Sequence, residues 1–121
     1  MNFTELDVWR EARVLVKMIY DCLQKFPKEE MYGLQSQIKR SAISIPSNIA
    51  EGCGRNHIKD TMQFLYIARG SAYELETQLY LSLDLNFIDE EQLNILLEKL
   101  KRIRILLAGF IKYHKVQITN T

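Results

Sequence analysis

The residues whose types could support catalysis gather between Arg40 and Arg55, in the stretch RSAISIPSNIAEGCGR. Asn48, Glu51 and Arg55 follow one another at helical spacing, and a carboxylate held in such a cluster could act as a general acid or base. The glycines of EGCGR resemble a phosphate-binding loop, but no strand precedes them and no Lys-Ser or Lys-Thr pair follows. Arginines in the same stretch favour structural ion pairs over acid-base chemistry.

Two further acids, Glu74 and Glu76, could pair with Glu51 in such chemistry, but they also have arginines nearby. Neither His57 nor His114 has a glutamate three residues earlier, which is the pattern of di-iron bundles. The histidines and the two cysteines also lack zinc-site spacing. We therefore expect no enzymatic activity, no metal and no cofactor.

Cys53 falls on the apolar face of its expected helix, which favours a buried structural thiol over a nucleophile. The only other cysteine is Cys22, and the two are not in a CxxC pair. Two reduced thiols are typical of a cytoplasmic protein. The first ten residues, MNFTELDVWR, contain acids and no apolar signal core, which also predicts a cytoplasmic location.

Positive charge is concentrated in residues 99–115, which hold six cations and no acid although the whole chain has a net charge of only +1. Four of these side chains fall within about a quarter turn of a helix, away from the apolar positions. This basic stripe consists of Lys101, Arg104, Lys112 and Lys115. Such a stripe could follow the phosphates of RNA or DNA, or it could be an ordinary solvated face whose cations suit a helix C-terminus.

The elements that would position these residues are four helices. The chain has 121 residues, two prolines, five glycines and no alternating strand pattern, and its length suits one domain, residues 1–121. Its apolar runs are only a few residues long, so we expect no membrane partner. Apolar residues recur every three or four positions in segments of about 4–26, 30–53, 56–85 and 89–110. Short connections between long helices predict an all-α, antiparallel, up-down-up-down four-helix bundle.

The ends of these segments have recognisable signals. Pro27 disfavours helix at the preceding residue, and Asn56 is a plausible N-cap for the third segment. Asp89 and Gln92 form a capping box for the fourth. Pro46 lies inside the second segment, where it removes one backbone hydrogen bond and predicts a kinked helix. The alternative is two helices separated at Pro46.

A polar stripe lies beside the apolar face of the second segment, and small hydroxyls are prominent in it. Its members are Gln37, Ser41, Ser44, Asn48, Glu51 and Arg55. If the second and third segments form a hairpin, Ser44 lies near Gly70 and Ser71, and Arg40 lies near Glu74. We therefore predict close helix approach at Gly70, an ion pair between Arg40 and Glu74, and a packing network rather than a catalytic site.

Aromatic residues recur every seven positions along the third segment, one position beyond the core. They are Tyr66, Tyr73 and Tyr80, with Phe87 continuing the register. One bundle has little room for a second aromatic seam, so these residues are a candidate subunit interface. The alternative is that the tyrosines lie at the core margin with their hydroxyls in water.

Taken together, FPKEEMYGLQSQIKRSAISIPSNIAEGCGR and ARGSAYELETQL resemble the bacterial four-helix-bundle family named for open reading frames in intervening sequences of 23S ribosomal RNA genes. The resemblance extends from LDVWREA to the fourth segment. The family pattern includes nine polar residues of this chain: Gln37, Arg40, Ser44, Asn48, Glu51, Arg55, Ser71, Glu74 and Glu76.

This resemblance implies a barrel-like homopentamer without established catalytic activity. It also includes a related branch, the accessory variability protein of diversity-generating retroelements, which associates with a reverse transcriptase and nucleic acid. Our main hypothesis is therefore a non-enzymatic oligomeric scaffold that binds RNA, DNA or a nucleic-acid-processing protein through the basic stripe. The alternative is a protein-protein interaction module with no nucleic-acid binding.

Overall fold

The computed structural model describes residues 2–119, which form four α-helices and no strand. The helices are α1 (Asp7–Leu23), α2 (Leu34–Cys53), α3 (Ile58–Asp84) and α4 (Glu90–Thr119). Short 3-10 helices at Phe3–Glu5 and Lys28–Glu30 precede α1 and α2. The predicted all-α four-helix architecture is therefore confirmed.

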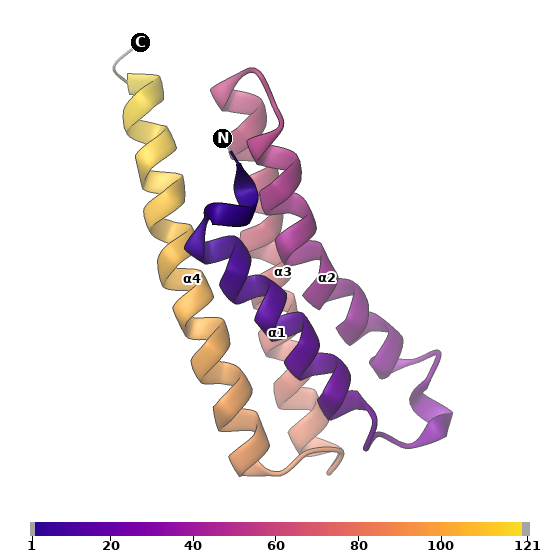
Figure 1. The fold of residues 1–121 in the computed structure, drawn as a ribbon. Helices are drawn as coiled ribbons and strands as arrows, with labels where there is room; N and C mark the ends of the chain where they lie inside the picture. The colour runs from indigo at the N-terminus through magenta and orange to yellow at the C-terminus, as the bar shows by residue number, and fades with distance from the viewer. Residues whose placement is uncertain (1, 120–121) are drawn as a thin grey trace.

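Each helix packs against two neighbours, so that α1, α2, α3 and α4 follow one another around the bundle. Within residues 2–119 the diagonal pairs, α1 with α3 and α2 with α4, have no Cα atoms within 8 Å of each other. Figure 1 shows α2 and α3 as a long hairpin, with α4 returning along α3 and the shorter α1 in front.

The helix ends follow local chemistry that the sequence predicts only in part. The Asp89 carboxylate accepts a hydrogen bond from the backbone N–H of Gln92 at 2.8 Å, which confirms the cap of α4. Asn86 has a φ of 63° in the preceding turn, a conformation that asparagine tolerates better than most residues. The prediction of Asn56 as the cap of α3 is wrong, because that helix begins after His57, which makes no side-chain cap bond.

The core is built from the periodic apolar positions, as predicted. Leu15, Ile45, Leu75 and Leu100, one from each helix, are fully buried. Each such side chain contributes about 1.5–3 kcal/mol through its removal from water. The last buried apolar side chain of α4 is Ile111, whereas Phe110, at the end of the predicted fourth segment, is only partly buried and packs against its own helix at His114.

Pro46 does not divide the second helix. Helix α2 continues from Leu34 to Cys53 with Pro46 inside it, so the alternative of two helices is wrong. Ile45 and Ile49, on either side of the proline, are both fully buried. Packing of this apolar face against the bundle offsets the loss of one backbone bond. The kink itself stays a prediction.

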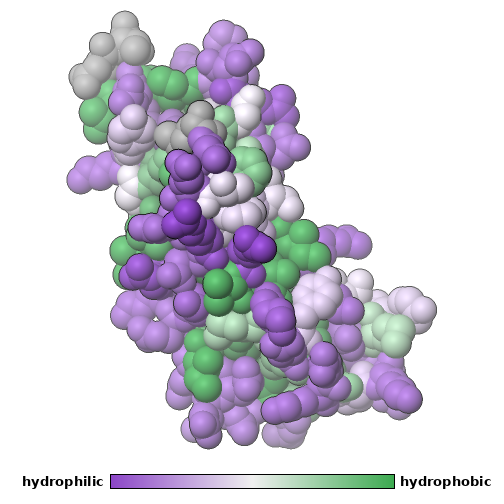
Figure 2. Space-filling model, viewed as in Figure 1, coloured by the Kyte–Doolittle hydropathy of each residue, from purple (hydrophilic) through white to green (hydrophobic). Residues whose placement is uncertain are grey.

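The face of the bundle in Figure 2 is mostly hydrophilic, with apolar side chains in separate groups. None of the helices within residues 2–119 combines the length and the apolar composition needed to cross a membrane.

Candidate nucleic-acid interface

The cations of α4 are divided between its two neighbouring helices. On the α1 side, the Glu11 carboxylate accepts hydrogen bonds from Lys99 Nζ at 2.7 Å and from Arg102 Nε at 3.0 Å. These bonds, first from Lys99 and then from Arg102, lower the pKa of Glu11 below its ordinary value. Two of the six cations in residues 99–115 are therefore paired with Glu11 in a cluster that joins α1 to α4.

The remaining cations are those of the predicted basic stripe. Lys101, Lys112 and Lys115 are exposed. Arg104 is 30% exposed, and its guanidinium forms an ion pair with the Glu76 carboxylate of α3 at 3.2 Å. The same guanidinium lies 5.4 Å from the centre of the Tyr73 ring, a cation-π distance. Arg104 is thus held in place by α3, whereas Lys101 and Lys112 project from the surface.

The tyrosines of α3 lie on the same side of the bundle as the basic stripe. Tyr73 is 53% exposed and Tyr80 is 48% exposed. Tyr80 and Lys101 line one pocket of about 310 Å³ between α3 and α4. We call the basic stripe, Tyr73 and Tyr80 together the α3–α4 face. The sequence predicts two separate surfaces here, and the fold combines them into one.

The other two aromatic residues of the predicted seam contact the chain's own core. Phe87 packs on Phe26 with ring centres 5.2 Å apart. Tyr66 is partly buried against the core and has the Arg69 guanidinium 4.9 Å from its ring centre. Tyr73 and Tyr80 are therefore the members of the seam that a partner could cover most fully.

The polar stripe of α2 does form a hydrogen-bonded contact with α3, at its centre. Ser44 Oγ and Ser71 Oγ are 2.7 Å apart, which confirms their predicted proximity. Asn48 Nδ2 donates to the Ser44 carbonyl at 2.8 Å and to Ser44 Oγ at 2.9 Å. Ser41, which is buried, donates to the Gln37 carbonyl within α2. Of these bonds only the Ser44–Ser71 contact joins α2 to α3, and the others lie within α2.

Several other members of the predicted network lie apart from it. Glu76 pairs with α4 rather than α2, because Glu74 and Glu76 are two residues apart and point about 200° from each other around the axis. Glu74 accepts a hydrogen bond from Gln78 within α3. The predicted Arg40–Glu74 ion pair is absent from the described residues, and Arg40 is exposed, as is the Gln37 side chain.

Gly70 does not provide the predicted close approach of helices. A Cβ built on Gly70 meets nothing within 4 Å, whereas one built on Gly52 lies 3.2 Å from both Phe64 Cβ and the Thr61 carbonyl oxygen. The close contact between α2 and α3 is therefore at Gly52, whose carbonyl also accepts a hydrogen bond from Thr61 Oγ1 at 2.8 Å.

The residues first considered for catalysis are engaged in other contacts. Glu51 forms an exposed ion pair with Arg55 at 3.2 Å, one helical turn away. The Arg55 guanidinium lies 4.5 Å from the centre of the Phe64 ring of α3. Asn48 bonds to Ser44, as described above. This geometry stabilises the end of the α2–α3 hairpin.

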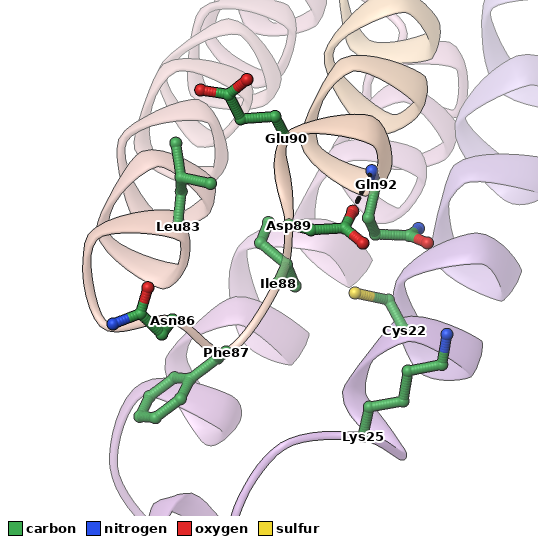
Figure 3. A pocket seen from close by; sticks show the side chains of 9 residues that line it. All are labelled: Cys22, Lys25, Leu83, Asn86, Phe87, Ile88, Asp89, Glu90 and Gln92. Carbon is green, nitrogen blue, oxygen red and sulfur yellow. Dashed lines mark hydrogen bonds between the residues drawn. The ribbon is translucent and has the colours of Figure 1, made fainter.

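A second pocket, of about 580 Å³, lies at the turn between α3 and α4 (Figure 3). Cys22 of α1 and Lys25, in the turn after α1, face Asp89 and Gln92 across it. Burial raises the pKa of the Cys22 thiol, which disfavours the nucleophilic thiolate at neutral pH. Burial also raises the pKa of the Cys53 thiol. The sequence predicts that Cys53 is buried, but the residue is only half-buried.

Across residues 2–119, no group of three or more His, Cys, Asp or Glu side chains is placed to hold a metal ion. Sequence reasoning missed Glu11, which joins α1 to α4. Glu11 is separated from its partners by 88 and 91 residues, so no local pattern reveals the contact. It also missed Thr61, whose hydroxyl ties α3 to α2.

Comparison with known proteins agrees with this fold. A solved structure from Bacteroides thetaiotaomicron, described as a protein of unknown function from the S23 ribosomal protein family, shares 27% identity with this chain. The match has a TM-score of 0.81 and covers 87% of this chain and 95% of that one. No match was found among curated proteins. The family model described as 23S rRNA-intervening sequence protein matches residues 4–109, so the chain belongs to that family.

Proposed function

We propose that this chain is a non-enzymatic, cytoplasmic, oligomeric bundle that binds RNA or DNA through the α3–α4 face. The observation that carries the proposal is the sorting of the α4 cations: Glu11 holds two of them on the α1 side, and the basic stripe remains on the other. The pairs made by Glu51 and Glu76 support a structural role for these acids. The free cysteines, Cys22 and Cys53, support a reducing compartment.

The length of the stripe suits a run of phosphates. Lys101 and Lys115 are separated by about 21 Å along α4, at 1.5 Å per residue. At about 3.4 Å per nucleotide along one strand, this distance corresponds to roughly six nucleotides. Three or four phosphate contacts predict a slope of about −2 to −3 for log K against log salt on a single strand, or a 20- to 50-fold loss of affinity between 50 and 200 mM salt.

The test is a charge reversal with a matched control. We expect the double variant Lys101→Glu with Lys112→Glu to lose at least tenfold in affinity for a fluorescein-labelled 12-nucleotide RNA or DNA. The control is Lys28→Glu with Lys39→Glu, which changes the net charge equally on the α1–α2 side of the bundle and should change affinity less than threefold. Equal losses in both variants, or no binding by the wild-type chain, would contradict the proposal.

A second candidate function is a protein-protein interaction module, and the exposure of Tyr73 and Tyr80 favours it. Exposed tyrosines are typical of protein interfaces, so a second copy of the chain or a nucleic-acid-processing protein could cover them. Family resemblance favours a homopentamer. Sedimentation velocity of the wild-type chain tests this: an oligomer supports self-association, and a stable monomer contradicts it.

A further inference from the structure

We propose that the nucleic acid bound on the α3–α4 face is single-stranded, with an unpaired base stacked on Tyr80. This inference rests on the proposed function, since it names the class of nucleic acid that the same face would bind. The inference is drawn from the side chains that line the pocket between α3 and α4. The cations of the basic stripe alone would not distinguish a single strand from a duplex.

The walls of that pocket have the chemistry of a base site. Tyr80 and Leu97 provide aromatic and apolar surface, and Asn94 and Glu98 provide hydrogen-bonding groups. The Glu76–Arg104 ion pair forms another part of the wall. An amide and a carboxylate can pair with the edge of a base, whereas a carboxylate repels a phosphate. Lys101 also lines the pocket and can contact the backbone of the strand.

Tyr80 is better placed than Tyr73 to accept a base. The Arg104 guanidinium lies 5.4 Å from the Tyr73 ring centre and is held there by Glu76, so one side of that ring is already in contact. The Tyr80 ring is 48% exposed, and among residues 2–119 it stacks on no other ring and faces no cation at cation-π distance. The two tyrosines are about 10.5 Å apart along α3, or roughly three nucleotide steps.

A duplex cannot use this pocket. Its bases are paired and stacked inside the helix, so a convex α-helical surface with a basic stripe meets its phosphates but not its ring faces. A single strand can turn a base outward onto an aromatic side chain while its phosphates follow the lysines. The combination of aromatic ring, base-pairing groups and cations therefore favours a single strand.

The experiment measures binding of a labelled 12-nucleotide single-stranded RNA, the same sequence as single-stranded DNA, and the blunt duplex of that DNA by fluorescence anisotropy. We expect Tyr80→Ala to weaken binding of the single strands by about 5- to 100-fold, as for other base-aromatic stacks, and binding of the duplex by less than twofold. Tyr80→Phe should retain the affinity, because the ring is kept. Tyr32→Ala, at a position 92% exposed in the loop before α2, is the control and should have no effect.

The outcomes separate this inference from the proposed function. If charge reversal of Lys101 and Lys112 abolishes binding while Tyr80→Ala changes nothing, the basic stripe binds nucleic acid and the stacking inference is overturned. An equal loss for duplex and single strands also overturns it. If Tyr80→Ala changes the sedimentation coefficient and leaves single-strand affinity intact, Tyr80 belongs to a subunit contact. A circular dichroism melt close to that of the wild-type chain confirms that each variant is folded.

Discussion

Gly52 and Gly70 lie in neighbouring helices, but they should respond in opposite ways to the same substitution. A Cβ at Gly52 would lie 3.2 Å from Phe64 Cβ and 3.2 Å from the Thr61 carbonyl oxygen. Both atoms are fixed to the α3 backbone, so they can move only if α3 shifts relative to α2. A Cβ at Gly70 would meet nothing within 4 Å.

The expected magnitudes follow from two opposing terms. Alanine has less backbone entropy than glycine in the unfolded chain and a higher helix propensity, so replacing a mid-helix glycine with alanine stabilises the folded state by about 0.5–1 kcal/mol. Gly70→Ala should therefore be more stable than wild type by that amount. Gly52 is next to the last residue of α2, where this gain is smaller. Overpacking costs about 1–3 kcal/mol, so Gly52→Ala should be destabilised by about 1 kcal/mol.

The assay is urea and thermal unfolding of both variants at one fixed protein concentration. An unfolding entropy of about 2.1 cal/mol/K per residue makes 1 kcal/mol equal to roughly 4 °C for a chain of this length. The two variants should therefore differ by about 6–8 °C. A Gly52→Ala variant that melts at or above the wild-type temperature would refute the assignment of the close α2–α3 contact to Gly52.

Two further predictions concern polar contacts between helices. Because the pKa of Glu11 is lowered in the folded state, its contribution to stability is present above the unfolded pKa and is lost as the pH falls through the folded pKa. The free energy of unfolding, measured between pH 7 and pH 3, should therefore fall more steeply for the wild-type chain than for Glu11→Gln. At pH 7 the Glu11→Gln variant should be about 1 kcal/mol less stable than wild type. Parallel pH profiles of the two proteins would contradict this. Ser44→Ala and Ser71→Ala should each lower the free energy of unfolding by about 1 kcal/mol, and a double-mutant cycle should give a coupling energy of at least about 0.5 kcal/mol. Additive losses would show that the 2.7 Å contact between the two hydroxyls does not stabilise the fold.

Periodicity predicts most of this fold, because each helix buries one continuous apolar face. Leu65 of α3 and Leu107 of α4, for example, each belong to a set of apolar residues at helical spacing, and both are fully buried. Helix caps are less predictable, because several residues near a helix boundary have side chains that could act as the N-cap. Asp89 fulfils its predicted role, whereas Asn56 does not, because the chain begins α3 only after His57.

The candidate site is predictable only as separate helix faces. Residues on one helix can be sorted by angle, so the basic stripe and the tyrosine seam each follow from the sequence. Which face meets which neighbour depends on contacts between distant segments. The sequence suggests Glu76 as a partner for α2, but its carboxylate binds Arg104 of α4. Arg40 likewise lacks its expected partner, since Glu74 bonds to Gln78.

The charge of α4 shows why a count of cations is a poor guide to a binding surface. Six positive side chains in residues 99–115 would form a band on more than one side of an isolated helix. In the bundle, Glu11 offsets one of the two positive charges on the α1 side by binding both Lys99 and Arg102. Glu76 fixes Arg104 on the other side without removing Lys101 or Lys112 from the surface.

The fold therefore converts a broadly basic helix into one directional stripe beside exposed aromatic rings. A polyanion would be drawn to that side by charge, and its bases would find ring surface there. Glu11 then has an indirect effect on binding: Glu11→Gln leaves Lys99 and Arg102 without their carboxylate partner and makes the α1 side of α4 more positive. Affinity for nucleic acid in this variant should rise slightly while dependence on Tyr80 falls, because strands gain a second, non-stacking path along α4.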